Sequence, residues 1–230
     1  MKRHVQSDKA VAGDATVAER LGALGTTTLS DALESLGSRG ECAGILSLGT
    51  GESRIAGPAV TVELAPVTEA SAEPHLGAAA IEAARPGDVV VVANHGVIHI
   101  AAWGGLLSEA ARLAGIAGIV IDGACRDVDE IARLGLAVFA RATTPLTARG
   151  RITERATGSP VHLAGREVRM GDWIVGDASG VVVVPASLCE AALVAGERIA
   201  AVEEEMRAEL LAGAPASRVL GTRYERMLQR

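Results

Sequence analysis

The chain has 230 residues, a mass of 23.4 kDa and a formal net charge of −6, and 49% of its residues are hydrophobic, enough for one large domain with a filled core. The acidic balance and the 2% aromatic content argue against a nucleic-acid-binding surface. No run of eighteen apolar residues occurs, so neither a membrane span nor a secretory signal is expected, and we expect a cytoplasmic protein.

The first quarter of the chain is predicted to be helical. Thr16 and Glu19 form a capping-box pattern, and Thr27 or Thr28 can begin a second helix. Residues 1–15 precede these signals and are expected to form a flexible N-terminus.

Between residues 59 and 140, segments with strand and helix patterns alternate and are joined by short connections. Such alternation favours parallel strands linked by right-handed crossovers, so we expect an α/β fold. The predicted strands are 59–64, 88–93, 118–121 and 136–140, and the predicted helices are 76–84, 100–113 and 128–134.

The last third of the chain changes character. Residues 161–185 predict short strands with glycine turns, and residues 186–211 predict a long amphipathic helix. The domain is expected to span residues 16–212. Residues 213–230 are then expected to form a C-terminal helix that packs on the domain or on a neighbouring subunit.

Both lysines, Lys2 and Lys9, lie within the first ten residues. The rest of the chain therefore offers no amine for a Schiff base or for pyridoxal phosphate. Chemistry on a carbonyl group would need a metal ion or oriented dipoles as its electron acceptor. The three cysteines show no Cys-x-x-Cys spacing and are expected to be reduced thiols.

Two adjacent glycines, Gly104 and Gly105, precede Leu106 and Leu107 in a helical pattern. Glycine costs a helix about 1 kcal/mol per residue relative to alanine, so the pair favours a helix that begins at this point. Unpaired amides at a helix N-terminus suit a carboxylate or a phosphate. Close packing of another helix against the glycines is an equally good interpretation.

Polar side chains follow the predicted strand 118–121, namely Asp122, Arg126 and Asp127. Open α/β sheets usually bind ligands beyond this end of their strands. Asp127 can offer an oxygen ligand to a hard cation, and Arg126 can hold a carboxylate or stabilise an enolate. Alternatively, Asp127 caps a helix and Arg126 forms an ordinary salt bridge.

Two histidines and three glutamates could contribute to a metal site, but each also has a purely structural interpretation. His95 and His99 have the i, i+4 spacing of helical metal ligands, but isolated histidines are more often packing or surface residues. Glu203, Glu204 and Glu205 would ordinarily form a solvated helix face.

The run WGGLLSEAARLAGIAGIVIDGACRDVDEI, residues 103–131, resembles the signature region of the RraA-like family, which includes 4-hydroxy-4-methyl-2-oxoglutarate aldolases. Four further segments match, so the resemblance covers roughly residues 17–212. It implies one domain with a β/β/α fold of the swivelling-domain type, parallel and mixed sheets, C-terminal helices, and a homotrimer or hexamer. The four segments are LSDALESLG (29–37), IAGPAVTV (55–62), RPGDVVVV (85–92) and GDASGVVVVP (176–185).

The resemblance also implies residue roles. Asp127 would bind Mg²⁺ or Mn²⁺, Arg126 would contact pyruvate, and the amides of Leu106 and Leu107 would hold the carboxylate of a keto acid. A glutamate of a neighbouring subunit, in the region that matches Glu203 to Glu205, would lie just beyond the direct ligands of the metal.

The expected function is therefore a divalent-metal-dependent lyase, an aldolase or decarboxylase. It would cleave a 2-oxo acid, such as a 4-hydroxy-2-oxo dicarboxylate or oxaloacetate, to give pyruvate. The aldolase pattern of the family is Asp-x20-Arg-Asp, but counting back from Arg126 gives Gly105 in place of the acid. Decarboxylation needs no base for a C4 hydroxyl, so it becomes relatively favoured unless His95 or His99 supplies that base.

Two other functions compete with the lyase. The first is a non-catalytic RraA-type protein that binds and inhibits a ribonuclease, which the missing acid at Gly105 would fit. Methyl transfer ranks last, because the sequence has no glycine-rich nucleotide loop after a first strand.

Overall fold

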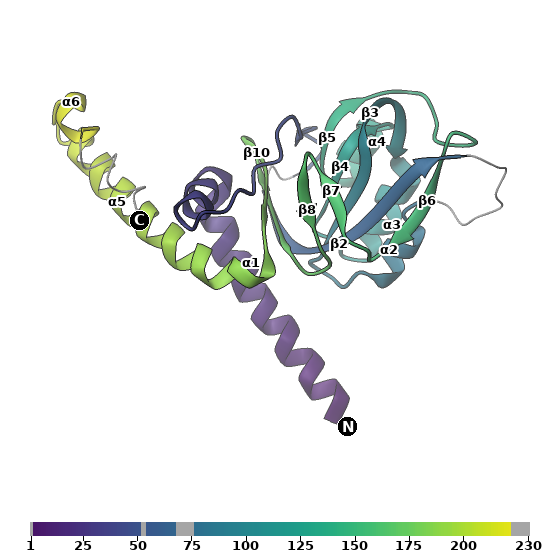
Figure 1. Cartoon of the computed structure of the whole chain (residues 1–230), viewed down its shortest axis with the longest axis horizontal. Coiled ribbons are helices and arrows are strands. Elements are labelled where there is room, and N and C mark those ends of the chain that lie inside the picture. Colours follow the sequence, from purple (N-terminus) through teal and green to yellow (C-terminus); the bar gives the residue numbers. More distant parts are fainter. Residues whose placement is uncertain (1, 52–53, 68–75, 222–230) are drawn as a thin grey trace.

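The computed structural model describes residues 2–51, 54–67 and 76–221, and only the backbone of residues 2–15 (Figure 1). The helices are α1 (Lys2–Ser35), α2 (Ala78–Ala83), α3 (Gly105–Leu113), α4 (Val128–Leu134), α5 (Cys189–Leu211) and α6 (Ala216–Val219), with a short 3-10 helix η1 (Ala186–Leu188). The strands are β1 (Leu46–Ser47), β2 (Ile55–Pro66), β3 (Val89–Trp103), β4 (Gly118–Cys125), β5 (Ala137–Thr143), β6 (Ile152–Thr157), β7 (Val161–Leu163), β8 (Arg166–Val168), β9 (Trp173–Asp177) and β10 (Gly180–Val184).

One mixed sheet of eight strands forms the centre of the molecule. Strands β2, β3, β4 and β5 run parallel, within the order β1-β5-β4-β3-β2-β9-β10, and β6 also pairs with β2. The segment 40–47 connects the two ends of this order. Its Cys42 amide donates to Val181 of β10 over 2.9 Å, and β1 pairs with β5. The sheet is therefore nearly closed, like a barrel.

The two faces of the sheet bury separate apolar clusters. Inside the curled sheet, Phe139 is fully buried among strand residues and beneath the β7–β8 hairpin. On the outside, α3 and α4 cover the parallel strands and bury Trp103 and Ile131. Every residue of β4 is buried, as expected for a parallel strand covered on both faces. The predicted α/β fold is confirmed.

Helices α1 and α5 cover β9 and β10 with a third apolar cluster. α1 consists of two helices that meet at Gly25, whose φ of 77° and ψ of 172° interrupt it. Asp177, at the end of β9, accepts hydrogen bonds from the Thr26 amide (2.8 Å) and the Thr26 hydroxyl (2.7 Å). The predicted pair of helices is present, but the first begins at Lys2 rather than at Thr16, and Asp177 caps the second one in place of Thr27 or Thr28.

Two predicted boundaries were wrong beside the polar segments. The helix predicted from residue 100 begins at Gly105, because β3 continues to Trp103, which lies opposite Cys125 of β4. The strand predicted over residues 118–121 likewise continues to Cys125. The hydrophobic pattern alone did not reveal that both strands extend this far.

The C-terminal part includes α6, which contacts α5 of the same chain. The predicted helix 213–230 otherwise falls partly on residues 222–230, which lie outside the described residues. The expected limits of the domain and the expected flexibility of residues 1–15 stay predictions. Among the described helices, none combines the length and the apolar character needed to cross a membrane.

Candidate active site

Helix α3 begins where β3 ends, with Gly104 as an extended N-cap residue that has no side chain of its own to cap the helix. The buried Trp103 donates its indole N–H to the Ser108 hydroxyl (2.9 Å), which donates to the carbonyl oxygen of Gly104 (3.0 Å). These two side chains fix the turn. The Ser108 amide also bonds to the Gly104 carbonyl, so the amides of Leu106 and Leu107, nearer the start, have no acceptor within the helix.

Asp127 occupies the N-cap position of α4 with a left-handed backbone, φ 58° and ψ 34°. This conformation is uncommon outside glycine, although aspartate tolerates it better than most residues. The side chain makes no capping hydrogen bond to α4. Its Oδ2 instead accepts hydrogen bonds from the Gly105 amide (3.1 Å) and from Nε of Arg126 (3.0 Å). The carboxylate therefore joins the starts of α3 and α4. Asp127 stands at a helix N-cap and Arg126 forms a salt bridge, as the alternative interpretation expected, but the Asp127 side chain caps α3 rather than α4.

The electrostatics keep this carboxylate charged. Burial alone would raise the pKa of Asp127, but the Gly105 amide and then the hydrogen bond and charge of Arg126 lower it below its ordinary value. The Asp127 side chain is 34% exposed and the Arg126 side chain 39%. An anion and a cation are thus held side by side within reach of a bound molecule.

Glu130 is a member of this cluster that the sequence analysis missed. A Cβ atom on Gly105 would lie 2.2 Å from Oε2 of Glu130, and one on Gly104 would lie 2.8 Å from Oδ2 of Asp127. Each glycine therefore leaves room for one carboxylate. The close-packing interpretation of the glycines holds, but carboxylates rather than a helix backbone occupy the space.

Glu130 lies where the family pattern would place the acidic side chain of residue 105. Its carboxylate reaches, from α4, the space that a side chain on Gly105 would fill. The sequence held one signal for this, because Glu130 follows Asp127 by three residues, which is about one turn along α4.

The two histidines do not join this cluster. His95 and His99 lie in β3 rather than in a helix, so the helical spacing of metal ligands was the wrong pattern. The His95 ring lies 2.9 Å from Oε1 of Glu63 on β2. Within the described part of the chain, no hydrogen bond or ion pair joins either histidine to the residues at the start of α3.

The glutamates of α5 are also distant in this chain. Glu203 to Glu205 lie on α5, at the opposite end of the molecule from α3 (Figure 1). Glu204 forms a long ion pair with Arg207 (3.5 Å) on the same helix. A contribution from a neighbouring subunit stays a prediction.

Asp122 supports the fold rather than the site. It lies inside β4, is 5% exposed, forms an ion pair with Arg141 and accepts a hydrogen bond from the Ala164 amide (2.9 Å). The expectation that it lies beyond the end of the strand was wrong. Its neighbour Cys125 is fully buried, and burial raises the pKa of its thiol to about 12, so it is not an activated nucleophile.

The donor atoms of the cluster fit a hard divalent cation. Asp127 and Glu130 bring two carboxylates to neighbouring glycines, and Mg²⁺ is commonly bound by one or two carboxylates with substrate oxygens and water completing its shell. Within the described residues, no group of three His, Cys, Asp or Glu side chains could enclose a metal ion. A cation bound here would have to complete its shell with substrate oxygens and water.

Comparisons with known proteins place the chain. A family model described as RraA-like, Aldolase/RraA, matches residues 26–183. A Halalkalibacterium halodurans protein named "Putative 4-hydroxy-4-methyl-2-oxoglutarate aldolase" is 35% identical over 160 residues, which cover 70% of this chain and 72% of that protein. Protein DlpA of Legionella pneumophila is 32% identical over 157 residues, which cover 68% of this chain but only 25% of DlpA.

Solved structures agree. An uncharacterized protein from Pseudomonas syringae superposes with a TM-score of 0.80 at 29% identity, covering 90% of this chain and 98% of that one. RraAS2 of Streptomyces coelicolor, described as an unusual member of the RNase ES inhibitor RraA protein family, gives 0.79 at 30% identity, covering 85% and 98%. Because the family model matches well over half of its residues, the chain belongs to the RraA-like family.

Proposed function

We propose that the chain is a divalent-metal-dependent carbon–carbon lyase that cleaves a 2-oxo acid to pyruvate, with oxaloacetate or a 4-hydroxy-2-oxo dicarboxylate as substrate. One observation carries the proposal. Asp127 adopts a left-handed backbone that directs its carboxylate to the Gly105 amide and Arg126 instead of capping its own helix. The aldolase name of the Halalkalibacterium relative supports the same reaction class.

The start of α3 would hold the substrate carboxylate. The amides of Leu106 and Leu107 have no acceptor within the helix and lie at the positive end of its dipole, which suits an anion. The neighbouring Arg126 would lie beside the 2-oxo group. Its guanidinium would stabilise the negative charge that develops on the enolate oxygen when the carbon–carbon bond breaks.

The two carboxylates would take different roles. Asp127 would bind Mg²⁺ or Mn²⁺, which would supply Lewis-acid polarisation of the 2-oxo carbonyl, and Glu130 would stay off the metal. In decarboxylation the electron pair of the broken bond passes to the enolate, and carbon dioxide leaves without loss of a proton. In retro-aldol cleavage the C4 hydroxyl must also lose its proton, and Glu130 is the candidate acceptor, because it fills the place of the acid missing at Gly105.

An assay of pyruvate formation tests the proposal. Purified protein is given oxaloacetate or 4-hydroxy-4-methyl-2-oxoglutarate with Mg²⁺ or Mn²⁺, and pyruvate is followed through lactate dehydrogenase. Turnover is expected to require the metal and to fall by about 100-fold or more in Asp127→Ala, since a ligand and a charge are lost. Asp129→Ala is the matched control, because Asp129 is an exposed acid in the first turn of α4, and it should retain activity.

The negative result is equally informative. If neither substrate yields pyruvate with either metal, the lyase proposal fails and the non-catalytic ribonuclease-binding alternative takes its place. RraAS2 is described as an unusual member of the RNase ES inhibitor RraA protein family. Assembly as a homotrimer or hexamer is part of the same proposal, with Glu203 to Glu205 of a neighbouring subunit approaching the site.

A further inference from the structure

The peptide that joins Gly104 to Gly105 is held from both sides. Its carbonyl oxygen, on Gly104, accepts hydrogen bonds from the Ser108 amide (3.0 Å) and the Ser108 hydroxyl (3.0 Å). Its N–H, on Gly105, donates to Oδ2 of Asp127 over 3.1 Å. The carbonyl and the N–H of a trans peptide point in opposite directions, so a group that fixes the carbonyl also aims the N–H.

Glycine on both sides makes this peptide easy to turn. Rotation of a peptide plane changes ψ of the residue before it and φ of the residue after it, and glycine tolerates values of both that other residues avoid. A turned peptide would present the Gly104 carbonyl oxygen to the Asp127 carboxylate, and two negatively polarised oxygens repel each other. The direction of the peptide therefore depends on the groups that hold its carbonyl.

Trp103 fixes the hydroxyl that holds this carbonyl. The indole N–H donates to the Ser108 oxygen over 2.9 Å, and the single hydroxyl proton of Ser108 is then directed to Gly104. Trp103 is 2% exposed and Ser108 is 0% exposed, so water is kept from both hydrogen bonds. The indole ring is itself held in place, because a Cβ atom on Gly77 would lie 2.6 Å from it.

We propose that Trp103 and Ser108 are positioning residues that hold the Asp127 carboxylate in the direction needed to bind a metal ion. The indole orients the hydroxyl, and the hydroxyl fixes the peptide between Gly104 and Gly105. The amide of that peptide then holds Oδ2 of Asp127. Within the described part of the chain, both hydrogen bonds of this carboxylate go to Oδ2, which leaves Oδ1 for a cation. The metal-binding part rests on the proposed function, whereas the direction of the peptide does not.

Hydrogen–deuterium exchange in the metal-free full chain tests the direction of the peptide. Mass spectrometry with fragmentation isolates the Gly105 amide. Its exchange should become about 10-fold faster in Asp127→Ala, because a hydrogen bond to a charged group is lost. Ser108→Ala leaves Asp127 in place but should accelerate the same amide by a similar factor. Trp103→Phe keeps an aromatic ring, removes the N–H donor and should accelerate it as well.

A second measurement follows the metal ion itself. Calorimetric titration with Mn²⁺ should show a dissociation constant about 10-fold higher in Ser108→Ala than in the wild type, because partners that orient a metal ligand typically contribute about 10-fold to 100-fold in affinity. A serine that only stabilised the start of α3 would leave this constant unchanged.

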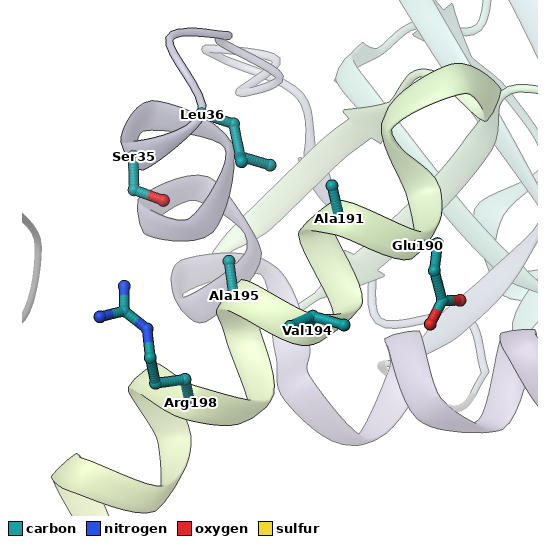
Figure 2. A pocket seen from close by; sticks show the side chains of 7 residues that line it. All are labelled: Ser35, Leu36, Glu190, Ala191, Val194, Ala195 and Arg198. Atoms are coloured by element: carbon teal, nitrogen blue, oxygen red, sulfur yellow. The ribbon is translucent and has the colours of Figure 1, made fainter. Parts of the chain in front are cut away.

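Two control variants remove comparable hydroxyl groups elsewhere. Ser35 donates its hydroxyl to the Ala32 carbonyl of its own helix over 2.7 Å and lies in the groove between α1 and α5, which no residue of α3 or α4 lines (Figure 2). The buried Thr50 hydroxyl donates to a backbone carbonyl (2.8 Å) and accepts from an N–H (3.1 Å), as that of Ser108 does. Ser35→Ala and Thr50→Val should leave both the exchange of the Gly105 amide and the Mn²⁺ affinity unchanged.

The proposal is overturned if the Gly105 amide keeps its wild-type exchange rate in Ser108→Ala or in Trp103→Phe. It is also overturned if Thr50→Val accelerates that amide equally, or if Ser108→Ala binds Mn²⁺ as tightly as the wild type. Failure of the proposed function looks different. If the exchange of Gly105 responds as expected but the wild type binds no Mn²⁺ and forms no pyruvate, the lyase proposal fails and the positioning of Asp127 by Ser108 stands.

Discussion

The contact between Gly105 and Glu130 yields a prediction with an unusual signature. A Cβ atom on Gly105 would lie 2.2 Å from Oε2 and 2.5 Å from Cδ of Glu130, far inside contact distance. Gly105→Ala must therefore displace the Glu130 carboxylate. Gly105 is the first residue of α3 and has no positive φ, so alanine does not strain the backbone there. We expect the protein to fold normally but to lose the function of Glu130.

The size of the effect follows from the role of Glu130. A positioned acid or base contributes about 100-fold to 10,000-fold in rate. Taking the lower value, Gly105→Ala and Glu130→Ala should each reduce kcat/KM for 4-hydroxy-4-methyl-2-oxoglutarate about 100-fold. The double variant should also lose about 100-fold instead of 10,000-fold, because both changes remove the same carboxylate. That corresponds to a coupling energy of about 2.7 kcal/mol.

The assay is pyruvate formation by the four proteins of this cycle, with thermal unfolding as the check on folding. Glu109→Ala serves as the control, because Glu109 is an exposed acid on α3 outside the cluster. Wild-type activity in Gly105→Ala would refute the reasoning. Losses that multiply in the double variant would refute it too, since they would mean that Glu130 does not act from the space above Gly105.

Two further predictions concern groups outside the site. Burial alone would raise the pKa of Asp177, but hydrogen bonds from Thr26 and Ser179 lower this pKa below its ordinary value. The contribution of Asp177 to stability is therefore present above about pH 4 and is lost as the pH falls through the folded-state pKa. Asp177→Ala should lower the free energy of unfolding at pH 7 by about 1–2 kcal/mol in urea titrations, and a difference that persists undiminished at pH 2 would contradict this origin. Burial raises the pKa of Cys42 and Cys125 to about 12, so both thiols should resist iodoacetamide at pH 8 in the native protein and react after unfolding. Mass spectrometry of tryptic peptides measures the extent of labelling at each cysteine. Rapid labelling of either thiol in the native protein would contradict this prediction.

Local sequence patterns predicted much of the fold. Alternating strand and helix patterns predicted the parallel strands, and α4 has the predicted bounds, Val128–Leu134. The start of α3 is instructive, because apolar periodicity placed it near residue 100, whereas the glycine pair indicated a helix that begins at Gly105. The backbone preference of glycine is local, so it was the more reliable signal.

The roles of the site residues stay predictions. The structure brings Gly105, Arg126 and Asp127 together, since the ends of neighbouring parallel strands meet at one edge of the sheet. Glu130 was missed because its three-residue spacing from Asp127 does not show that its side chain reaches Gly105 on another helix. Asp122 was misplaced because its partner, Arg141, lies on another strand.

The sequence by itself determined the order of strands and helices, the turn at the start of α3 and the residue types available for chemistry, because these depend on neighbours along the chain. Only the tertiary structure decided which distant groups meet. Asp177 caps a helix 151 residues away at Thr26, and Glu130 fills the space left by Gly105. Such contacts depend on how packed elements orient their side chains, which periodicity and local preference do not specify.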